Sequence, residues 1–454
     1  MSKLRPYQKE GVKQIIKFKG RVLLADEMRL GKTIQTLWYL KIRPKIRPAL
    51  VICPSGAKWV WEEQAHEHIG MDSIILSGRK PIKATRSTIA DWPELTIINY
   101  EIVHYWKDFL KKMKYQIALI DECHYIKNRG RQRTSACISI ARKVPQVIAI
   151  SGTPIVNKPI EIYSILNLID KERWSKKWDF AWAYCKPKHN GWGWDLSGHS
   201  NTKKLNKILR KTCMIRRRRK DVYSQLPDKI RMVVPLDMRN PKEYRYAESD
   251  FAGWLGNKSP TRLKRALQAE SLTKLGYLKR LATRLKIKAV KAWVDNFLEE
   301  SDEKLVLLGL QKPAIQYLCK KYDKIAVNGR VSPVKRWKAV KEFQTNKHKR
   351  LYIGNIIASG TAIELKPANT MAFFELDWVP GNHTQAEDRI VHVHDKEPPS
   401  IYYLVAKGTI EQDLCKILQR KSRVVSSVLD GDKNVEDMNI FDKLMTAVQE
   451  RNSS

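Results

Sequence analysis

The sequence predicts an α/β fold of two mostly parallel β-sheets, each with helices on both faces, together with helical insertions. Short apolar runs rich in Val and Ile recur along the chain, and polar or helical segments separate each run from the next. Strands that alternate with helices in this way are typical of parallel sheets covered on both faces. The runs form two series, so we expect two α/β units.

The first series starts with the apolar run at Val22. Its later strands are expected at Ala49–Cys53, Ser73–Leu76, Thr96–Ile98, Ile117–Ile120 and Val147–Ile150. Ligands bind at the carboxyl ends of such strands, and the segments there read D-E-M-R-L-G-K-T, C-P-S-G, N-Y-E, D-E-C-H and S-G-T-P. From Lys158 to about Arg231 the pattern is helical, with an aromatic, glycine-rich insert at Asn190–Gly198.

The second series lacks a phosphate loop of its own. Its strands are expected at Lys304–Leu308, Lys324–Val327, Arg350–Ile353, Met371–Leu376 and Ile401–Val405. We therefore expect a first unit at residues 1–232 and a second at 301–454, ending in helices and a polar tail. Residues 233–300 are expected to form a basic helical connection, near whose start residues 232–236 look like a strand.

Composition narrows the class of protein. A chain of 454 residues, 43% hydrophobic and with 14 Trp, is long enough for two or three well-packed domains. The N-terminal residues lack the apolar core of a signal peptide, and no stretch approaches the roughly 20 apolar residues of a membrane span. Seven scattered Cys without a C-x-x-C pair argue against a zinc site or disulfides and favour an intracellular location. A nucleus and a bacterial or phage-infected cytoplasm both fit, and the compact chain favours the latter.

The net charge of +38 favours a polyanionic partner. Nucleic acid fits better than a membrane surface, because no basic amphipathic anchor stands apart from the folded pattern. Between Lys258 and Lys291 a helical background carries many Lys and Arg and one acid, Glu270. A solvated helix face would give the same pattern, but the global charge favours contact with a DNA backbone.

The stretch Val22–Thr36 predicts a phosphate-binding loop between a strand and a helix. Gly31, Lys32 and Thr33 match the end of G-x-x-x-x-G-K-[ST], although Asp26 stands at its first position. Lys32 supplies charge for the β- and γ-phosphates and Thr33 a hydroxyl for Mg²⁺, and the helix N-terminus favours an anion. G-K-T alone arises often by chance, so this stretch needs partners elsewhere.

An acidic pair, Asp121 and Glu122, ends the apolar strand Ile117–Ile120. A capping role is the alternative, but carboxylates at a buried strand end are costly unless they are used. We expect Asp121 to hold Mg²⁺ through water and Glu122 to polarise the attacking water. His124 could be structural, but beside this pair we expect it to relay the nucleotide state.

Gln385 and Arg389 lie four residues apart in a helical segment after Asp377-Trp378, and so share one face. An Arg opposite a phosphate loop can stabilise transition-state charge, worth about 10³–10⁵ in rate. A surface helix pair is the alternative if the segment is considered alone.

Taken together, the motifs resemble the Swi/Snf family of superfamily-two helicase-like ATPases, in the family's order and over nearly the whole chain. They are L-R-P-Y-Q (Leu4–Gln8), D-E-M-R-L-G-K-T (Asp26–Thr33), C-P-S at Cys53 with Trp61, D-E-C-H (Asp121–His124), S-G-T-P with Asn157, R-R-R-R-K-D-V with Q-L-P-D-K (Arg216–Lys229), A-S-G-T-A-I-E-L (Ala358–Leu365), D-W-x-P-G-x-x-x-Q-A-E-D-R (Asp377–Arg389) and Y-L-V-A-K-G-T-I-E (Tyr403–Glu411). The chain looks closest to the fork-remodelling, annealing-helicase branch, and it also resembles a phage branch-migration helicase of this family.

The resemblance implies two RecA-like lobes that use ATP and Mg²⁺ to step along duplex, forked or branched DNA. It implies catalytic roles for Lys32, Asp121, Glu122, Gln385 and Arg389, with Arg389 a finger supplied across the cleft. It implies nucleotide contacts at Arg5, Gln8, Asp26, Gly31, Lys32, Thr33 and Ile34, with adenine read by Gln8, and metal contacts at Thr33 and Asp121. It implies DNA binding or coupling at Ser151, Gly152, Thr153, Asn157, Ser359, Gly360 and Thr361.

Three positions depart from the family pattern. Arg29 stands where the family has Gly in the phosphate loop, Ala362 where it usually has Gly, and His392 where it has a second finger arginine. A loop Gly commonly supplies a positive φ or a close backbone approach, and Arg does neither cheaply. His is mostly neutral at pH 7 and is shorter than Arg.

Three functions remain open from sequence. The first is an ATP-driven translocase on double-stranded DNA that remodels forks or migrates branches. The second is a strand-separating helicase, with Trp192–Trp194 as a wedge unless those residues form a packed aromatic cluster. The third is a DNA-binding module with a weakened or inactive ATPase, which the three departures favour and the intact Lys32, Asp121, Glu122 and Arg389 oppose.

Overall fold

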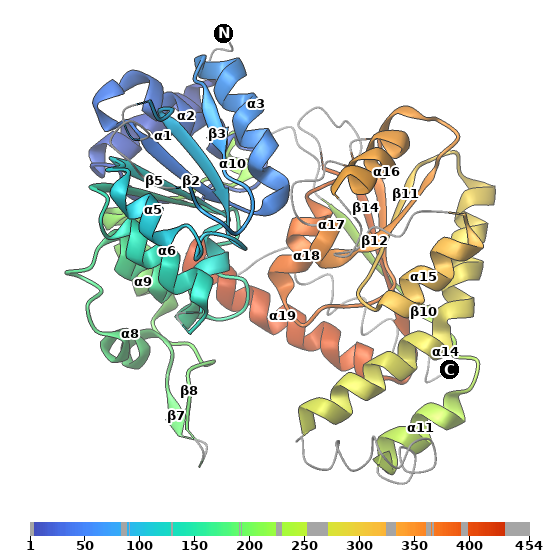
Figure 1. Cartoon of the computed structure of the whole chain (residues 1–454). Coiled ribbons are helices and arrows are strands. Elements are labelled where there is room, and N and C mark those ends of the chain that lie inside the picture. The colour runs from blue at the N-terminus through green and yellow to red at the C-terminus, as the bar shows by residue number, and fades with distance from the viewer. Residues whose placement is uncertain are drawn as a thin grey trace. The chain divides into compact units, whose positions relative to one another are not determined.

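The computed structural model describes residues 4–82, 89, 91–128, 130–189, 191, 193–223, 229–251, 271–323, 333–359, 365, 367–391 and 398–431. The chain divides into two compact units (Figure 1). Unit 1 comprises Met1–Gln225 and Arg423–Asn434, and unit 2 comprises Leu226–Ser422 and Val435–Ser454.

Unit 1 is built on a sheet of seven parallel strands in the order β3-β4-β2-β5-β6-β1-β9. The strands are β1 (Arg21–Leu24), β2 (Ala49–Cys53), β3 (Ser73–Ile75), β4 (Leu95–Asn99), β5 (Ile117–Asp121), β6 (Gln146–Ile150) and β9 (Met214–Ile215). The six strands predicted for this unit are confirmed to within two residues, because each is a short apolar run, and all of them except the partly buried edge strand β3 are largely buried.

Helices cover both faces of this sheet (Figure 1). One face packs against α1 (Pro6–Lys17), α2 (Lys32–Ile42) and α3 (Lys58–Ile69), and the other against α5 (Lys107–Lys112), α6 (Gln132–Ala141), α7 (Tyr163–Ile169), α8 (Lys177–Tyr184) and α9 (Thr202–Thr212). The alternation along β2 shows why: Leu50 and Ile52 join one core cluster, whereas Val51 and Cys53 join the other. Short helical turns complete the unit at η1 (Pro44–Ile46), η2 (Ser55–Ala57), η3 (Cys123–Ile126), η4 (Pro159–Ile162) and α10 (Arg219–Val222).

Strands interrupt the helical pattern that was expected from Lys158 to about Arg231 with an insert at Asn190–Gly198. Met214 and Ile215 form the edge strand β9, paired in parallel with Leu23 and Leu24. A two-residue strand is too short to show a period in the sequence. The glycine-rich insert forms the antiparallel hairpin of β7 (Lys188–His189) and β8 (Trp194–Asp195), and β10 already begins at Ile230.

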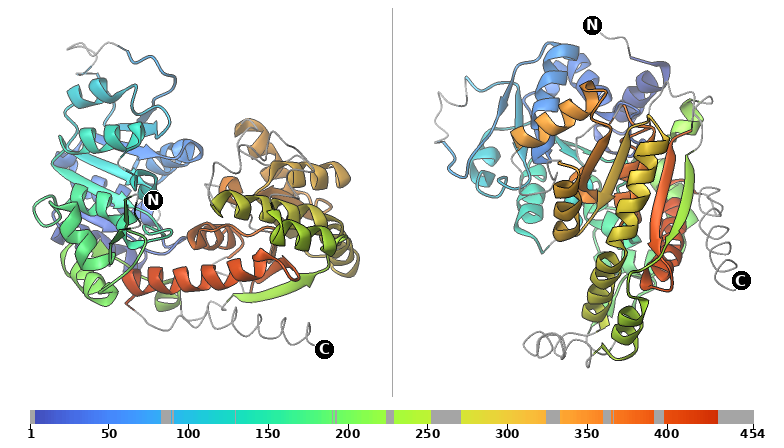
Figure 2. Two further views of the ribbon diagram at one scale, coloured as in Figure 1. Left: turned by 90° about the horizontal axis from the view of Figure 1, so that it is seen from below. Right: turned by 90° about the vertical axis from the view of Figure 1, so that its right-hand side faces the viewer.

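Unit 2 contains a five-stranded parallel sheet in the order β10-β14-β13-β11-β12. The strands are β10 (Ile230–Leu236), β11 (Leu305–Gly309), β12 (Leu351–Asn355), β13 (Thr370–Phe373) and β14 (Ser400–Ala406). Figure 2 shows β10 running alongside β14 at the sheet edge. Four of the five strands predicted for the second series are confirmed, and the fifth, Lys324–Val327, lies outside the described residues.

Both faces of the unit 2 sheet are also buried. Along β11, Leu305 and Leu307 pack with α14 (Ser271–Glu300) and α15 (Lys312–Lys321). Val306 and Leu308 pack with residues of the opposite cluster, which α16 (Pro333–Thr345), α17 (Ile356–Ser359), α18 (Pro380–Glu387) and α19 (Ile410–Leu429) supply. Another described helix, α11 (Pro241–Ser249), packs beside α14 in a smaller cluster.

The unit boundaries differ from the expected ones. The division falls between Gln225 and Leu226, and β10 pairs with β14 over all seven of its residues, so the expected connection at 233–300 contributes a strand and covering helices to unit 2. At the other end, Arg423–Asn434 belongs to unit 1, and Val428 and Leu429 are buried in its core. Of the basic stretch from Lys258, the part beyond residue 270 is described and lies on α14. No helix within the described ranges is long and apolar enough to span a bilayer.

Candidate active site

Three loops that carry the predicted chemistry meet at one edge of the unit 1 sheet. The phosphate loop follows β1, the Asp121–Glu122 pair ends β5, and Ser151 follows β6. These strands are neighbours in the order β5-β6-β1, and all run parallel. Their carboxyl ends therefore lie side by side, which is where parallel sheets bind ligands.

The phosphate loop contains two residues in the left-handed region. Gly31 has φ +69° and Arg29 has φ +67°. The position where the family has Gly thus requires a positive φ, and the backbone adopts it although the side chain is Arg. Holding a non-glycine residue there costs about 1–2 kcal/mol. Arg29 therefore preserves the loop conformation at a local cost in strain.

Lys32 lies folded against its own loop. Its ammonium donates to the backbone carbonyls of Asp26 at 2.9 Å and Glu27 at 3.1 Å. Burial lowers the pKa of Lys32, and the carboxylates of Glu122, Asp26 and Asp121 act in the opposite direction. A Cβ added to Gly152 would lie 3.4 Å from Lys32 Nζ and 2.8 Å from a side-chain atom of Met28, so only glycine fits where the loop after β6 meets the phosphate loop.

Asp121 is held at the end of β5 by groups on neighbouring elements. Trp61 Nε1 donates to its Oδ2 at 2.9 Å, and the backbone N–H of Glu122 donates to its Oδ1 at 2.9 Å. The hydroxyl of Tyr100 donates to the Asp121 carbonyl oxygen. Burial, followed by the neighbouring Glu122 carboxylate, raises the pKa of Asp121 to about 6. A carboxylate whose pKa is raised in this way at a strand end is typical of functional sites.

Ser151 connects the acidic pair to the loop after β6. Its hydroxyl donates to Glu122 Oε2 at 3.0 Å and accepts the backbone N–H of Thr153 at 3.1 Å. His124 Nδ1 lies 3.2 Å from the same hydroxyl and 3.3 Å from Glu122 Oε2. Glu122 itself has φ +47°, an uncommon conformation for a non-glycine residue. A shift in Glu122 would therefore reach both His124 and the Ser151–Thr153 loop.

The predicted nucleotide contacts on α1 and α2 lie around Gly31. A Cβ at Gly31 would meet Gln8 Nε2 at 2.4 Å and a methyl of Ile34 at 2.9 Å. The Gln8 amide is fixed by the backbone N–H of Arg5 at 2.9 Å and by the Leu30 carbonyl at 3.5 Å. The Gln8 amide therefore lies directly beside the phosphate loop, and its adenine-reading role stays a prediction.

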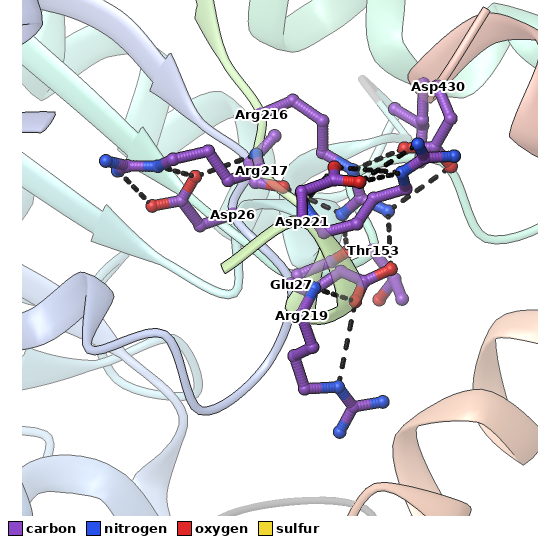
Figure 3. A network of polar contacts seen from close by, with 12 residues as sticks. Asp26, Glu27, Thr153, Arg216, Arg217, Arg219, Asp221 and Asp430 are labelled. Atoms are coloured by element: carbon purple, nitrogen blue, oxygen red, sulfur yellow. Dashed lines mark hydrogen bonds and ion pairs between the residues drawn. The ribbon is translucent and has the colours of Figure 1, made fainter. Parts of the chain in front are cut away.

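A cluster of arginines braces the same loop from β9 and α10 (Figure 3). Arg216, whose side chain is 6% exposed, donates to Asp430 at 2.9 Å and to Glu27 at 3.4 Å. It also donates to the carbonyls of Ala25 at 2.8 Å and Gly152 at 3.0 Å. Burial works to lower the pKa of Arg216, but Asp430 and Glu27 outweigh it and raise the pKa. The Arg216 guanidinium thus contacts the phosphate loop, the loop after β6 and the residue that follows α19.

Asp26 is paired with the next arginine. Its fully buried carboxylate accepts from Arg217, through the backbone N–H at 3.0 Å and Nε at 2.9 Å, and from Gln35 at 3.1 Å. Glu27 accepts the backbone N–H of Arg219 at 2.7 Å. The Asp26 carboxylate therefore shapes the loop from within the fold, while its carbonyl receives Lys32.

In unit 2, Gln385 and Arg389 lie close together on the chain but not on one uninterrupted helix. Gln385 is buried in α18, which ends at Glu387, and Arg389 follows in a tighter turn in which its N–H donates to the Ala386 carbonyl at 2.9 Å. The turn is anchored by Glu387, whose carboxylate accepts from Arg231 at 2.7 Å and Lys229 at 2.9 Å. Burial alone would raise the pKa of Glu387, but Arg231 and Lys229 outweigh burial and hold it far below its usual range.

The oxygen donors near Lys32 suit a hard divalent cation bound together with phosphate. Thr33 follows Lys32 in the first turn of α2, and Asp121 and Glu122 supply carboxylates from the end of β5, two strands away from β1 in the sheet. Mg²⁺ is usually bound in this way, through one or two carboxylates, waters and substrate phosphates rather than an all-protein cage. The described residues contain no group of three or more His, Cys, Asp or Glu side chains that could hold a metal ion.

The other predicted positions lie in the loop after β6 and around the end of α17, or outside the described residues. Ser359 ends α17, and Gly360, Thr361, Ala362 and His392 lie outside the described residues. The backbone N–H of Asn157 donates to Glu161 at 2.9 Å, which fixes the loop after Thr153.

The bracing residues were missed as site residues. Trp61 and the arginine run are visible in the sequence as motif elements, but nothing there links Trp61 to Asp121 or Arg216 to Asp430 across 214 residues. The available signal was a run of four Arg beside a short apolar pair, in a chain whose phosphate loop carries two adjacent acids.

Comparisons with known proteins show which family the chain resembles. The model of the SNF2-related domain family matches residues 7–313. A Xenopus tropicalis protein, the SWI/SNF-related matrix-associated actin-dependent regulator of chromatin subfamily A-like protein 1, is 30% identical over 96% of this chain and 46% of its own length. The human DNA annealing helicase and endonuclease ZRANB3 is 28% identical over 95% of this chain and 41% of its own length.

The chain spans about half the length of the curated relatives it matches. A solved structure, the Sulfolobus solfataricus SWI2/SNF2 ATPase core in complex with dsDNA, aligns with 95% of this chain and 94% of its own, at 22% identity and a TM-score of 0.44. The family model covers well over half of the sequence, including the phosphate loop, the acidic pair and the arginine cluster. The chain therefore belongs to the SNF2-related family.

Proposed function

We propose that the chain is an ATP-driven translocase that moves on double-stranded DNA and remodels forks or migrates branches. The observation that carries the proposal is the meeting of Lys32, the Asp121–Glu122 pair and the Ser151–Thr153 loop at adjacent strand ends. A site that only bound nucleotide would not need Glu122 hydrogen-bonded to a loop on the next strand.

The residues have distinct roles in the proposal. Lys32 exchanges its two carbonyl partners for the β- and γ-phosphates of ATP. Thr33 and Asp121 would hold Mg²⁺, which when bound would supply positive charge for the phosphates. Glu122 orients the attacking water. Because the Ser151 hydroxyl donates to Glu122, hydrolysis changes a hydrogen bond of the Ser151–Thr153 loop, which we assign to the DNA backbone. Arg389 as a finger residue belongs to the same proposal.

The DNA partner is supported by charge. A net charge of +38 makes binding to phosphates favourable, and such binding weakens steeply as salt rises. Among the relatives, the human protein is named as a DNA annealing helicase. Seven buried, unpaired cysteines fit the intracellular setting that such a role needs.

ATP hydrolysis on different DNA structures tests the proposal. We expect blunt duplex, forked and four-way DNA to stimulate hydrolysis at low salt, and Lys32→Ala to abolish it. Branch migration of a labelled four-way junction should then require ATP, while a simple tailed duplex keeps its strands together. Displacement of the labelled strand from that duplex would instead indicate a strand-separating helicase. No stimulation by any DNA would refute the motor proposal.

A weakened ATPase is a second candidate, and the strain at Arg29 favours it. It predicts slow turnover in the native chain and faster turnover in Arg29→Gly. Equal rates in the two proteins, at saturating ATP and duplex, would eliminate Arg29 as a cause of weakness.

A further inference from the structure

A cluster of exposed tryptophans projects from unit 1. Trp178 and Trp182 lie one turn apart on α8, and Trp194 lies on β8 of the hairpin that extends away from the sheet (Figure 1). The Trp194 ring meets Trp178 at 5.6 Å and Trp182 at 5.4 Å between ring centroids, at interplanar angles of 71° and 75°. We call these three residues the tryptophan cluster.

The cluster is not part of the core. Its members are 43%, 58% and 47% exposed for Trp178, Trp182 and Trp194, whereas Phe180 and Tyr184 of α8 are buried in the unit 1 core. The opposite face of a surface helix normally carries polar residues. Of the described residues, one other tryptophan, Trp59, is exposed to this degree. Contacts with Trp194 hold the short hairpin to α8, yet about half of each indole remains in solvent.

Exposed lysines flank the cluster along the chain. Lys176, Lys177, Lys186 and Lys188 are all exposed, and Asp179 is the one acid between residues 176 and 189. At the end of β8, the carboxylate of Asp195 accepts from Ser197 through both the backbone N–H and the hydroxyl, at 2.8 Å. These hydrogen bonds are the largest cause of the lowered pKa of Asp195, to which Lys158 and Lys188 also contribute. The surface thus offers flat aromatic faces among cations.

We propose that the tryptophan cluster binds unpaired nucleotides of a DNA strand, with bases stacked on the indoles and phosphates paired with the surrounding lysines. This rests on the proposed function, because it identifies the part of a forked or branched substrate that the motor holds apart from the duplex. Intact duplex does not fit, since its base faces are covered by neighbouring pairs. Stacking of a base on an aromatic side chain is sequence-tolerant, and losing one such contact weakens binding by about 5- to 150-fold.

The test separates base stacking from phosphate attraction. The ligands are a blunt duplex, the same duplex with a ten-thymine overhang, and the same duplex with an abasic overhang of equal charge. Affinities are measured without ATP, by anisotropy at fixed salt. We expect the native protein to bind the thymine overhang at least fivefold more tightly than the abasic overhang. Trp182→Ala should remove this difference and leave blunt-duplex affinity unchanged, whereas Trp182→Phe should keep most of it.

Trp59→Ala is the matched control, because Trp59 is 54% exposed on α3 and outside the cluster. It should leave the thymine preference intact. Trp194→Ala should also remove the preference, and Trp182→Ala decides the matter if the hairpin loosens in that variant. Equal affinity of the native protein for the thymine and abasic overhangs would overturn the proposal, as would an unchanged preference in Trp182→Ala.

Other occupants give different results. If Trp182→Ala abolished sedimentation with phosphatidylglycerol vesicles but kept the thymine preference, the cluster would be a membrane contact and the proposal would fail. Failure of the motor proposal is read separately, from ATP hydrolysis on blunt duplex. A protein without such hydrolysis can still show or lack the thymine preference.

Discussion

Arg216 makes the strongest quantitative prediction, because all five of its N–H donors have partners. Nε and one Nη serve Asp430, that same Nη also reaches Glu27, and the other Nη serves the carbonyls of Ala25 and Gly152. Arg216→Met keeps most of the apolar stem but leaves a carboxylate that is 12% exposed without its cation. Removing one partner of a buried ion pair costs about 3–5 kcal/mol.

Native-state hydrogen exchange measures this cost locally. We expect amides of β1, β9 and the end of α19 to exchange about 10²–10⁴-fold faster in Arg216→Met, following from that free energy at tenfold per 1.4 kcal/mol. Amides of β11 and β12 in unit 2 provide an internal reference and should not change.

The matched control is Arg173→Met. Arg173 pairs with Asp170 at 3.3 Å, but the two side chains are 50% and 33% exposed, so the loss should be about 0–1 kcal/mol. If Arg216→Met accelerated exchange no more than Arg173→Met, or accelerated both units equally, the bracing role of Arg216 would be refuted.

Three further predictions concern single side chains. Because burial raises the pKa of Asp121 from 3.8 to about 6, its stabilising contribution is present below pH 3.8 and lost as pH rises through about 6. Asp121→Asn should therefore stabilise the nucleotide-free protein at pH 7.5 by about 1–2 kcal/mol. This is less than the free energy that corresponds to the full pKa shift, because the side chain is partly exposed and the substitution removes one hydrogen-bond acceptor. Thermal melts should show the gain vanishing near pH 4, and a lower melting temperature at pH 7.5 would contradict it. The pKa of Glu387 is lowered, so its contribution is present above pH 4.5 and lost as pH falls below that value. Glu387→Gln should cost about 3 kcal/mol at pH 7 in urea denaturation, and the cost should shrink in acid, whereas a pH-independent cost would argue against the ion pairs. At Arg29, Arg29→Gly should change stability by less than about 1 kcal/mol, since relieved strain offsets chain entropy, whereas Arg29→Val should destabilise by more. Equal melting temperatures for the two variants would rule out a positive φ at position 29.

Much of the fold was predictable because it depends on local pattern. Strands such as Ala49–Cys53 are continuous apolar runs, and both faces of the parallel sheet bury them. The order of neighbouring strands was not predictable, although the loops at their carboxyl ends were. The site residues Lys32, Asp121 and Glu122 could be found because each belongs to a motif with a chemical reason for its spacing.

The rest depends on contacts between distant parts of the chain. The burial of Val428 in the unit 1 core, in the last turn of a helix that begins in unit 2, has no signal in local periodicity. Asp26 was expected near nucleotide because of its place in the loop, but its carboxylate is buried against Arg217, which lies 191 residues later. The exposure of Trp194 also depends on tertiary structure, since a glycine-rich aromatic insert could equally have packed inward.

ATP hydrolysis with and without blunt duplex DNA, in the native protein and in Lys32→Ala, tests the central claim most directly. At low salt we predict that duplex accelerates hydrolysis by the native protein at least tenfold, on the order of one unit in log rate or about 1.4 kcal/mol, and that Lys32→Ala hydrolyses no ATP under either condition. A native rate that duplex leaves unchanged, or an Lys32→Ala variant as active as the native protein, would contradict a motor driven from this phosphate loop.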